Sequence, residues 1–298
     1  MQLDESEVRR LLRMEDVIPA MERALAAFSS GIVVQPVRTM LPVDQHQGFL
    51  GLMPAYTGDA LGTKLVTFYP QNTGIPTHHA VIQLFHPETG EPLVTMDGRL
   101  ITEVRTAAVS AVATKYLARP DASVLAILGT GVQARSHLEA LRLVCSLGEV
   151  RVWSPRHAET FARELGVIAA SSAEEAVRGA DVVVTATTSR TPVLRGEWLS
   201  PGAHINAIGA PRPDWRELDD AVLRRARLYV DSREAASTES GDVIAVGTER
   251  VIGEIGDIVS RTAPGRQSPK DITLFKSLGL AVEDVVTADL VYRKALGV

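Results

Sequence analysis

The segment that most constrains the fold of this chain is a glycine-containing turn near its middle. An apolar run ends at Leu128 and passes through Gly129-Thr-Gly131-Val-Gln-Ala134 into a helical pattern. This succession of strand, tight turn and helix is typical of a dinucleotide-binding unit, in which the cofactor pyrophosphate lies on the first amides of the helix. Gly129 permits the turn, Gly131 leaves room for the pyrophosphate, and Ala134 allows close packing of helix on strand. The predicted cofactor-binding residues here are Gly129, Thr130, Gly131, Val132 and Gln133.

The second half of the chain has the pattern of a doubly wound fold. Short apolar segments alternate with helical segments on both sides of the glycine turn, and the run at 181–187 is typical of a buried parallel strand. Such alternation predicts a parallel sheet with helices on both faces. We therefore predict an α/β protein with a Rossmann domain over residues 116–275.

The first half has a different pattern. A helix is expected over 5–30, followed by five short strands separated by Pro and Gly turns with no helix between them, at 37–43, 49–53, 60–68, 80–86 and 92–96. This pattern predicts an antiparallel sheet, followed by an Ala-rich helix over 101–117 that connects two domains. The last helical stretch, near 279–296, is expected to return to the first domain. We predict an α+β domain over 1–115, joined by a C-terminal helix within 276–298.

Composition and charge exclude several classes of partner. The 298 residues carry a net charge of −5 without a basic patch, so nucleic acid is not an expected partner. Cys145 is the single cysteine, and no Cys/His cluster has zinc-like spacing, so neither a disulfide nor a metal site is expected. The first residues lack the apolar core of a signal peptide, and no apolar run approaches the length of a membrane span. We expect a cytoplasmic protein without a membrane partner.

The end of the second Rossmann strand indicates the cofactor. NAD-binding versions of this unit place a carboxylate there, which accepts a hydrogen bond from the ribose 2′-hydroxyl. This chain has Trp153-Ser-Pro-Arg156 instead. A serine hydroxyl and a guanidinium suit a 2′-phosphate, so Ser154 and Arg156 favour NADPH, with NADH as a possible alternative. Arg156 as a solvated loop charge is the other interpretation.

Three basic residues of the first domain form a candidate substrate site. Lys64 interrupts an apolar strand, where an unpaired ammonium is costly, so it requires an anionic partner. We hypothesise that Arg38, Lys64 and Arg105 bind a substrate carboxylate. Each of them alone is also compatible with a surface charge or an internal ion pair. His78, just before a strand, is a weaker candidate for lining the pocket and is otherwise a structural histidine.

Eight segments distributed over nearly the whole chain resemble the ornithine cyclodeaminase and mu-crystallin family. They are Gln35-Pro-Val-Arg-Thr, Leu52-Met-Pro-Ala-Tyr, Thr63-Lys-Leu-Val-Thr-Phe-Tyr, Met96-Asp-Gly, Arg105-Thr-Ala-Ala-Val-Ser-Ala, Leu128-Gly-Thr-Gly-Val-Gln-Ala, Ile205-Asn-Ala-Ile-Gly-Ala and Phe275-Lys-Ser-Leu-Gly. The resemblance implies an N-terminal domain that binds substrate and forms a homodimer, and a Rossmann domain that binds a nicotinamide cofactor. It also implies that Arg38, Lys64 and Arg105 bind the substrate carboxylate. Thr106, in the same motif as Arg105, is counted among the expected cofactor-binding residues.

The stretch Gly209-Ala-Pro-Arg-Pro-Asp-Trp-Arg-Glu-Leu-Asp219 distinguishes branches of that family. Cyclodeaminases place an aspartate two residues after the glycine, where it engages the distal amine of ornithine. This chain has Pro211 there, which carries no charge and accepts no hydrogen bond through its ring. The stretch instead resembles the mu-crystallin-type ketimine reductases. Asp214 is the nearest carboxylate and is either a weaker substrate ligand or a turn residue after Pro213.

The resemblance implies hydride transfer from NADPH to the C=N carbon of a cyclic ketimine carboxylate, of the 1-piperideine-2-carboxylate or 1-pyrroline-2-carboxylate type, which gives a cyclic L-amino acid. The imine proton comes from solution, from Lys64 or from a water. One alternative is another enzyme of the family, either an ornithine cyclodeaminase or an alanine- or opine-type amino acid dehydrogenase acting on a keto acid. The other is a non-catalytic, NADP-dependent ligand-binding protein of the crystallin kind.

Overall fold

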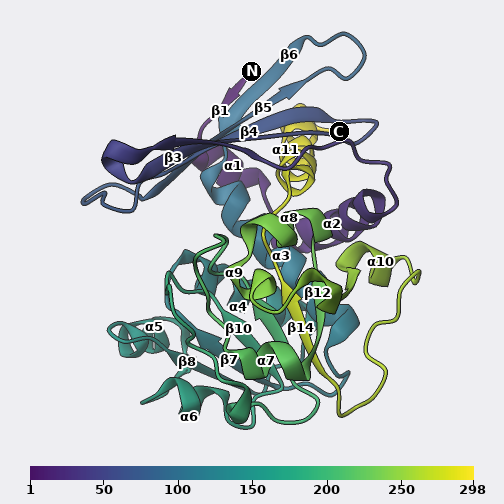
Figure 1. Cartoon of the computed structure of the whole chain (residues 1–298). Helices are drawn as coiled ribbons and strands as arrows, with labels where there is room; N and C mark the ends of the chain where they lie inside the picture. Colours follow the sequence, from purple (N-terminus) through teal and green to yellow (C-terminus); the bar gives the residue numbers. More distant parts are fainter. The chain divides into compact units, whose positions relative to one another are not determined.

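The computed structural model describes every residue from Met1 to Val298, and the chain divides into two compact units (Figure 1). The first unit comprises residues 1–106 and 279–298, and the second comprises residues 107–278. The division falls inside helix α3 (Arg99–Leu117), whereas the division expected from the sequence fell at residue 115, near the end of the same helix.

The first unit contains a six-stranded sheet in the order β1-β6-β5-β4-β3-β2. Its neighbouring strands are antiparallel except β1, which lies parallel to β6. The strands are β1 (Gln2–Leu3), β2 (Thr39–Val43), β3 (Gly48–Tyr56), β4 (Leu61–Phe68), β5 (His78–Phe85) and β6 (Pro92–Asp97). The five longer strands confirm the predicted sheet. β1 has only two residues, too few to give a periodic signal in the sequence.

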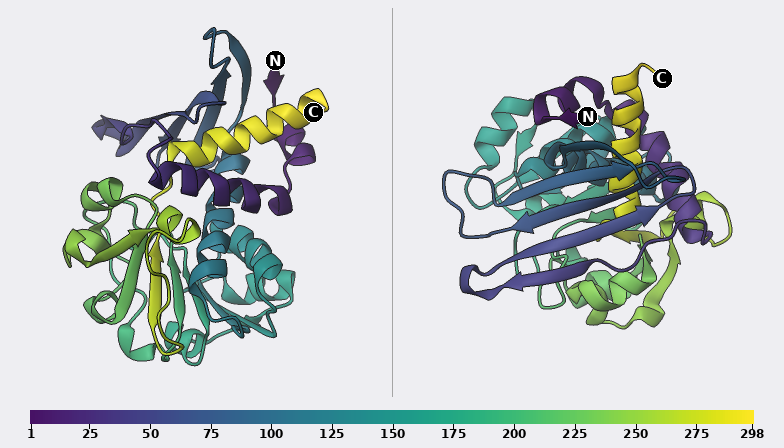
Figure 2. Two further views of the ribbon diagram at one scale, coloured as in Figure 1. Left: turned by 90° about the vertical axis from the view of Figure 1, so that its right-hand side faces the viewer. Right: turned by 90° about the horizontal axis from the view of Figure 1, so that it is seen from above.

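Three whole helices and the first turns of α3 complete the first unit. The whole helices are α1 (Glu5–Leu11), α2 (Met14–Ser29) and α11 (Ala281–Leu296). The sequence predicted one helix over 5–30. In the structure Asp4 caps α1 through a capping box, and the backbone becomes extended at Leu12, so that α2 begins separately. α11 lies along β3, β4 and β5 beside α2, as Figure 2 (left) shows for the yellow and purple helices.

The two faces of this sheet have different surroundings. Met53, Lys64 and Ile82 pair in register on β3, β4 and β5, and all three are buried on the face that α11 covers. The residues one position along these strands point the opposite way, because side chains alternate between faces. That outer face is seen in Figure 2 (right), where no helix of the same unit crosses it. Strand alternation therefore places Lys64 inside an otherwise apolar layer.

The second unit contains an eight-stranded, entirely parallel sheet in the order β13-β12-β14-β11-β10-β7-β8-β9. Its strands are β7 (Val124–Leu128), β8 (Glu149–Trp153), β9 (Ile168–Ala169), β10 (Val182–Thr185), β11 (His204–Ala207), β12 (Ala226–Val230), β13 (Val251–Glu254) and β14 (Ile272–Lys276). The predicted doubly wound parallel sheet is confirmed. β9, β13 and β14 were not predicted.

Helices connect these strands and cover both faces of the sheet. They are α4 (Val132–Val144), α5 (Ala158–Leu165), α6 (Ala173–Val177), α7 (Asp220–Arg225), α8 (Arg233–Glu239), α9 (Gly241–Ile244) and α10 (Ile255–Val259). Leu125 and Ile127 of β7 pack with the cluster that contains Leu138 of α4, whereas Ala126 and Leu128 belong to the cluster on the other face. Burial on both faces explains why the strands are apolar throughout.

No helix of the structure combines the length and the apolar character that crossing a membrane requires.

Candidate functional site

The glycine turn lies at the carboxyl end of β7, the edge of a parallel sheet where ligands bind in doubly wound folds. Gly129 has a φ of 119°, and its amide donates a hydrogen bond of 2.9 Å to the Trp153 carbonyl at the end of β8. A Cβ at this position would lie 2.3 Å from the Ala186 carbonyl oxygen. Glycine is therefore required at position 129 by both the backbone conformation and the close approach of the segment after β10.

Gly131 has no such structural constraint. It is the N-cap of α4, it provides no side-chain cap, and a Cβ built on it meets nothing within 4 Å. The amides of Val132 and Gln133 thus begin a 13-residue helix without a capping side chain. A pyrophosphate fits such a helix start, because the amides donate hydrogen bonds and the helix dipole favours negative charge. The open space beside Gly131 is compatible with its predicted role of leaving room for the phosphates of a dinucleotide.

The residues expected to select the cofactor surround the end of β8. The Ser154 hydroxyl accepts hydrogen bonds from the Thr130 hydroxyl at 3.2 Å and from the His157 amide at 3.1 Å, so its own proton remains to donate to a phosphate. Arg156 lies two residues later on the exposed loop. The structure therefore connects the glycine turn with Ser154 directly and places Arg156 beside it in the chain.

The three basic residues expected to bind substrate all belong to the first unit, and we name them the basic cluster: Arg38, Lys64 and Arg105. Lys64 lies in β4, Arg105 in α3, and Arg38 in the segment before β2. Lys64 and Arg105 are buried and Arg38 is half-buried. The fold brings the three cations together, because Asp284 pairs with both Lys64 and Arg105, and Arg38 donates to the carbonyl of Gly279, which lies against the Arg105 guanidinium.

The partner of Lys64 within the chain is a carboxylate that the sequence analysis did not identify. Lys64 Nζ forms an ion pair of 2.5 Å with Asp284 Oδ2. Arg105 donates from Nε to Asp284 Oδ1 at 2.9 Å and from Nη1 to Glu283 Oε2 at 2.5 Å. Both acids are fully buried in the first turn of α11. The structure therefore shows the internal ion pair that the sequence had left open for Lys64, while the binding of a substrate carboxylate stays a prediction.

A signal for these acids was present in the sequence. Glu283 and Asp284 stand in an apolar helix, as Lys64 stands in an apolar strand. Acidic residues in a first helical turn usually lie in solvent and interact with the helix dipole. The position of Glu283 and Asp284 in the sequence therefore did not indicate that they are buried.

Burial and charge determine the protonation of Lys64. Burial in the sheet lowers the pKa of Lys64 to about 8, the Asp284 carboxylate opposes this decrease, and the charges of Arg105 and Arg38 add to it. Burial likewise lowers the pKa of His78, and the positive charge of Lys64 lowers it further. His78 begins β5, and its ring lies 4.5 Å from that of Phe68 between centroids. The pKa of His78 therefore lies below its ordinary value, whereas Lys64, with a pKa of about 8, is mostly an ammonium at pH 7.

The remaining predicted residues have these positions. Thr106 is buried in α3, where its hydroxyl donates to the Thr102 carbonyl at 2.7 Å. Asp214 belongs to the second unit and lies on an exposed turn 3.7 Å from Arg212 Nε. The neighbouring Trp215 ring is flanked by the guanidinium groups of Arg212 and Arg190 at 5.3 and 5.1 Å. Within the second unit, Asp214 therefore has the geometry of a turn residue.

A buried polar network at the carboxyl ends of β10, β11 and β14 was also not predicted. The Glu217 carboxylate accepts hydrogen bonds from Thr185 Oγ1 at 2.9 Å and from the Thr187 amide at 2.8 Å. Lys276 Nζ donates to the Gly209 carbonyl and forms an ion pair of 3.5 Å with Asp242. Burial raises the pKa of Glu217, and the charge of Lys276 opposes the increase. The network fixes the segment after β10, which abuts Gly129.

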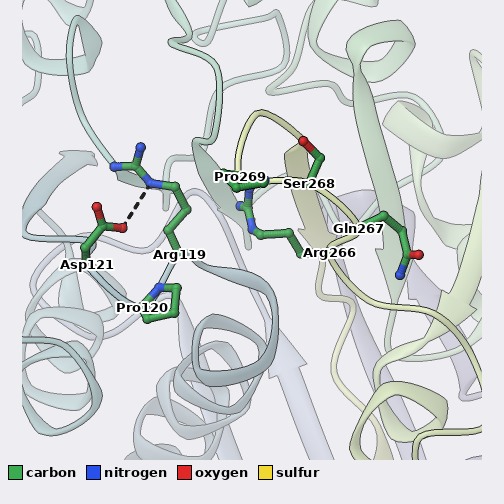
Figure 3. A pocket seen from close by; sticks show the side chains of 7 residues that line it. All are labelled: Arg119, Pro120, Asp121, Arg266, Gln267, Ser268 and Pro269. Carbon is green, nitrogen blue, oxygen red and sulfur yellow. Dashed lines mark ion pairs between the residues drawn. The ribbon is translucent and has the colours of Figure 1, made fainter.

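A cavity of about 450 Å³ lies at the opposite edge of this sheet (Figure 3). Its walls come from residues 119–121 and 266–269, which precede β7 and β14. Arg119 is already paired with Asp121 at 3.4 Å and with Asp181, and Arg266 donates to the Leu117 carbonyl. Because its cations have partners and it lies at the amino ends of the strands, this cavity is not the candidate site.

No group of three or more His, Cys, Asp or Glu side chains is arranged to hold a metal ion.

The parallel sheet, the glycine turn and the uncapped start of α4 define a protein with the Rossmann dinucleotide-binding fold. The chain belongs to the ornithine cyclodeaminase/mu-crystallin family, whose model matches residues 1–298. The predicted fold class and the family resemblance are both confirmed.

Relatives are similar over almost their whole length. The ketimine reductase mu-crystallin of Mus musculus is 53% identical over 97% of this chain and 96% of its own. The Δ1-pyrroline-2-carboxylate reductase of Thermococcus litoralis, solved with NADH and L-proline, has a TM-score of 0.95 and 41% identity over 100% of this chain and 98% of its own. An archaeal alanine dehydrogenase dimer with bound NAD has a TM-score of 0.95 and 39% identity over 100% of this chain and 96% of its own.

The two glycines of the turn provide a matched test of the cofactor site. We expect Gly131→Ala to fold normally and to bind NADPH about tenfold more weakly, a loss of about 1.4 kcal/mol, because the methyl group occupies the phosphate space. Gly129→Ala should instead lose more than about 2 kcal/mol of folding stability from the strained φ and the clash with Ala186. NADPH titration and urea unfolding measure both effects, and normal NADPH affinity in Gly131→Ala would contradict the assignment.

Proposed function

We propose that this chain reduces the C=N bond of a cyclic ketimine carboxylate, of the 1-piperideine-2-carboxylate or 1-pyrroline-2-carboxylate type, to a cyclic L-amino acid with NADPH. The basic cluster is the observation that carries the proposal, because it gathers three cations in a mostly buried position beside the carboxylates of Glu283 and Asp284. The mouse relative is a ketimine reductase, and the T. litoralis relative was solved with NADH and L-proline, a cyclic amino acid. Both relatives are named as reductases of imines, which is the class of the proposed reaction.

The basic cluster binds and orients the substrate carboxylate. Arg38 and Arg105 present planar guanidinium groups that suit bidentate binding, and Lys64 adds a compact charge between apolar neighbours. Holding the carboxylate at several points fixes the adjacent imine carbon, and such positioning contributes to rate by removing rotational freedom before the reaction.

The cofactor is held by the residues around the glycine turn. The amides of Val132 and Gln133 bind the pyrophosphate, while Ser154 and Arg156 bind the 2′-phosphate. When bound, the nicotinamide supplies the hydride that the imine carbon accepts. The protein's contribution is the placement of both groups.

Lys64 is suited to both carboxylate binding and proton donation. With a pKa of about 8, it is mostly an ammonium at neutral pH and releases a proton more readily than an exposed lysine does. A lysine that had lost its charge at neutral pH would neither bind a carboxylate nor protonate an imine nitrogen. The two alternatives to Lys64 as the proton source are a water molecule and an imine that is already protonated in solution.

Pro211 disfavours the cyclodeaminase alternative. It is exposed in the loop after β11, directly after Ala210, whose φ of 55° turns the chain. Without a carboxylate at this position, the second amine of ornithine has no acceptor there. Reductive amination of a keto acid uses the same carboxylate cluster, and the experiment below separates it by its substrate.

We also propose that the outer face of the first unit's sheet binds a second copy of this chain. Leu52, Leu65 and Val81 lie next to one another in register across β3, β4 and β5 and are 37%, 40% and 44% exposed. Leu41 and Tyr56 extend the same face. A row of exposed aliphatic side chains on a sheet face is typical of an interface, and the archaeal alanine dehydrogenase relative is a dimer.

The test of the proposed reaction is the initial rate of NADPH oxidation with 1-piperideine-2-carboxylate and 1-pyrroline-2-carboxylate. Pyruvate with ammonia, and ornithine with NAD⁺, are run in parallel. We expect rapid NADPH oxidation with the cyclic imines, none with pyruvate and ammonia, and no proline formed from ornithine, because a cyclodeaminase regenerates its NAD⁺ and is detected only by its product. Lys64→Met should reduce kcat/KM by about 100- to 1,000-fold while NADPH binding is unchanged. The exposed Lys270→Met is the control, and equal rates in the two variants would refute the role of Lys64.

Arg156→Gln tests the cofactor preference. We expect the affinity for NADPH to decrease about tenfold, because a charge-assisted hydrogen bond of about 1.5 kcal/mol or more is lost, while the affinity for NADH is unchanged. Arg163→Gln serves as the control, because it removes an exposed arginine from the neighbouring helix α5. A parallel decrease for both cofactors would show that Arg156 does not recognise the 2′-phosphate.

Leu65→Lys tests the proposed dimer. A lysine in the centre of the apolar row should convert the protein from dimer to monomer in analytical ultracentrifugation, with its circular dichroism unchanged. Leu143→Lys, at an exposed position of α4, should remain dimeric. A monomeric parent protein would contradict the proposed dimer. A dimer that survives Leu65→Lys would show that the interface lies elsewhere.

A further inference from the structure

The carboxylate of Asp284 bridges two members of the basic cluster, one through each oxygen. Oδ2 lies 2.5 Å from Lys64 Nζ, and Oδ1 accepts from Arg105 Nε at 2.9 Å. We propose that Asp284 is a positioning residue that fixes Lys64 and Arg105 relative to each other and keeps Lys64 in its ammonium form for the substrate. This inference rests on the proposed function, because the substrate carboxylate is the ligand for which the two cations are arranged.

The start of α11 is built around the cluster. The segment 279–284 contacts each of the three cations: the Gly279 carbonyl accepts from Arg38 Nη2 at 2.8 Å, Glu283 and Asp284 bind Arg105, and Asp284 binds Lys64. The Val282 amide donates to Gln35 Oε1 at 2.8 Å, which ties the same turn to the segment that carries Arg38. A single short segment therefore sets the positions of all three cations.

Gly279 shows how closely this segment approaches the cluster. Its φ is 83°, and a Cβ there would lie 2.5 Å from Arg105 Nη1. Any larger residue would displace the guanidinium that Asp284 and Glu283 hold. The close approach makes the arrangement rigid, which is what a positioning role requires.

Titratable groups from four elements face Lys64. The charged ones are Arg38 from the segment before β2, Arg105 from α3 and the carboxylate Asp284 from α11, and the fourth is the imidazole of His78 from β5. Burial and the two arginines favour the neutral amine, whereas Asp284 favours the ammonium. Removing the Asp284 charge therefore shifts Lys64 toward a form that has no charge to bind a carboxylate.

Glu283 offers a matched control because it is adjacent to Asp284 and equally buried. Its Oε2 lies 2.5 Å from Arg105 Nη1, and its charge is not among the main influences on the Lys64 pKa. Glu283→Gln removes the same charge from the same helical turn and the same arginine, but leaves the contact between Asp284 and Lys64. A difference between the two variants therefore reports on that contact.

The experiment compares pH profiles of kcat/KM for the parent, Asp284→Asn, Glu283→Gln and Asp284→Glu with 1-piperideine-2-carboxylate. The alkaline decline in the parent should lie near the Lys64 pKa of about 8. In Asp284→Asn we expect this decline to move about 1–3 pH units lower, which is the effect of losing a close opposite charge. Glu283→Gln should keep the parent midpoint. Asp284→Glu should restore the midpoint but raise KM, because the charge returns in a different position.

A binding measurement separates this inference from the proposed reaction. Pyridine-2-carboxylate is a planar monocarboxylate that NADPH does not reduce, and calorimetry follows its binding to the NADPH-loaded protein. Near pH 8 we expect affinity about tenfold weaker in Asp284→Asn than in Glu283→Gln, with melting temperatures confirming that both variants fold. Equal midpoints and equal affinities in the two variants would overturn the role of Asp284, even if the parent reduces the imine. Failure of the parent to reduce any cyclic imine would refute the proposed function, whereas the binding comparison would still decide the role of Asp284.

Discussion

The cost of burying the Lys64 ammonium is the constraint on which the first unit depends. The side chain is only 2% exposed and lies between Met53 and Ile82 on the covered face of the sheet. A cation in such a place must have an ionic partner, and the chain provides Asp284 from its C-terminal helix. Because replacing a buried ion pair by apolar residues is often neutral or stabilising, stability alone does not explain why the pair exists. The proposed binding of a substrate carboxylate, in contrast, requires a cation at this position.

The second unit depends on a different constraint, the contact between the glycine turn and the segment after β10. Gly129 has no space for a side chain beside the Ala186 carbonyl, and Glu217 holds the Thr187 amide next to it. Lys276 and Asp242 extend the same buried network at the carboxyl ends of the strands. These contacts hold the glycine turn in place at the carboxyl edge of the sheet. The first turn of α4 keeps uncapped amides, which suit a phosphate.

Local patterns in the sequence predicted most of the fold and only part of the candidate site. The antiparallel sheet, the parallel sheet and the glycine turn follow from periodicity and turn residues, which act over short distances. β14 was missed because its five residues, Ile-Thr-Leu-Phe-Lys, are few and have no following helix in the same unit that would mark another strand–helix repeat. The partner of Lys64 was missed because ion pairs between distant segments leave no local pattern, so the requirement for an anion was recognised but its source was not. Asp284 becomes identifiable only when α11 is seen to return to β4.

The measurement that tests this account most directly is a crystal structure of the protein with NADPH and pyridine-2-carboxylate. The account predicts that the ligand carboxylate lies within hydrogen-bond distance, about 2.7–2.9 Å, of nitrogen atoms of Lys64 and at least one arginine of the basic cluster, with Asp284 still bridging Lys64 and Arg105. A carboxylate bound elsewhere, with the basic cluster contacting only Glu283 and Asp284, would contradict it and leave the three cations with a purely structural role.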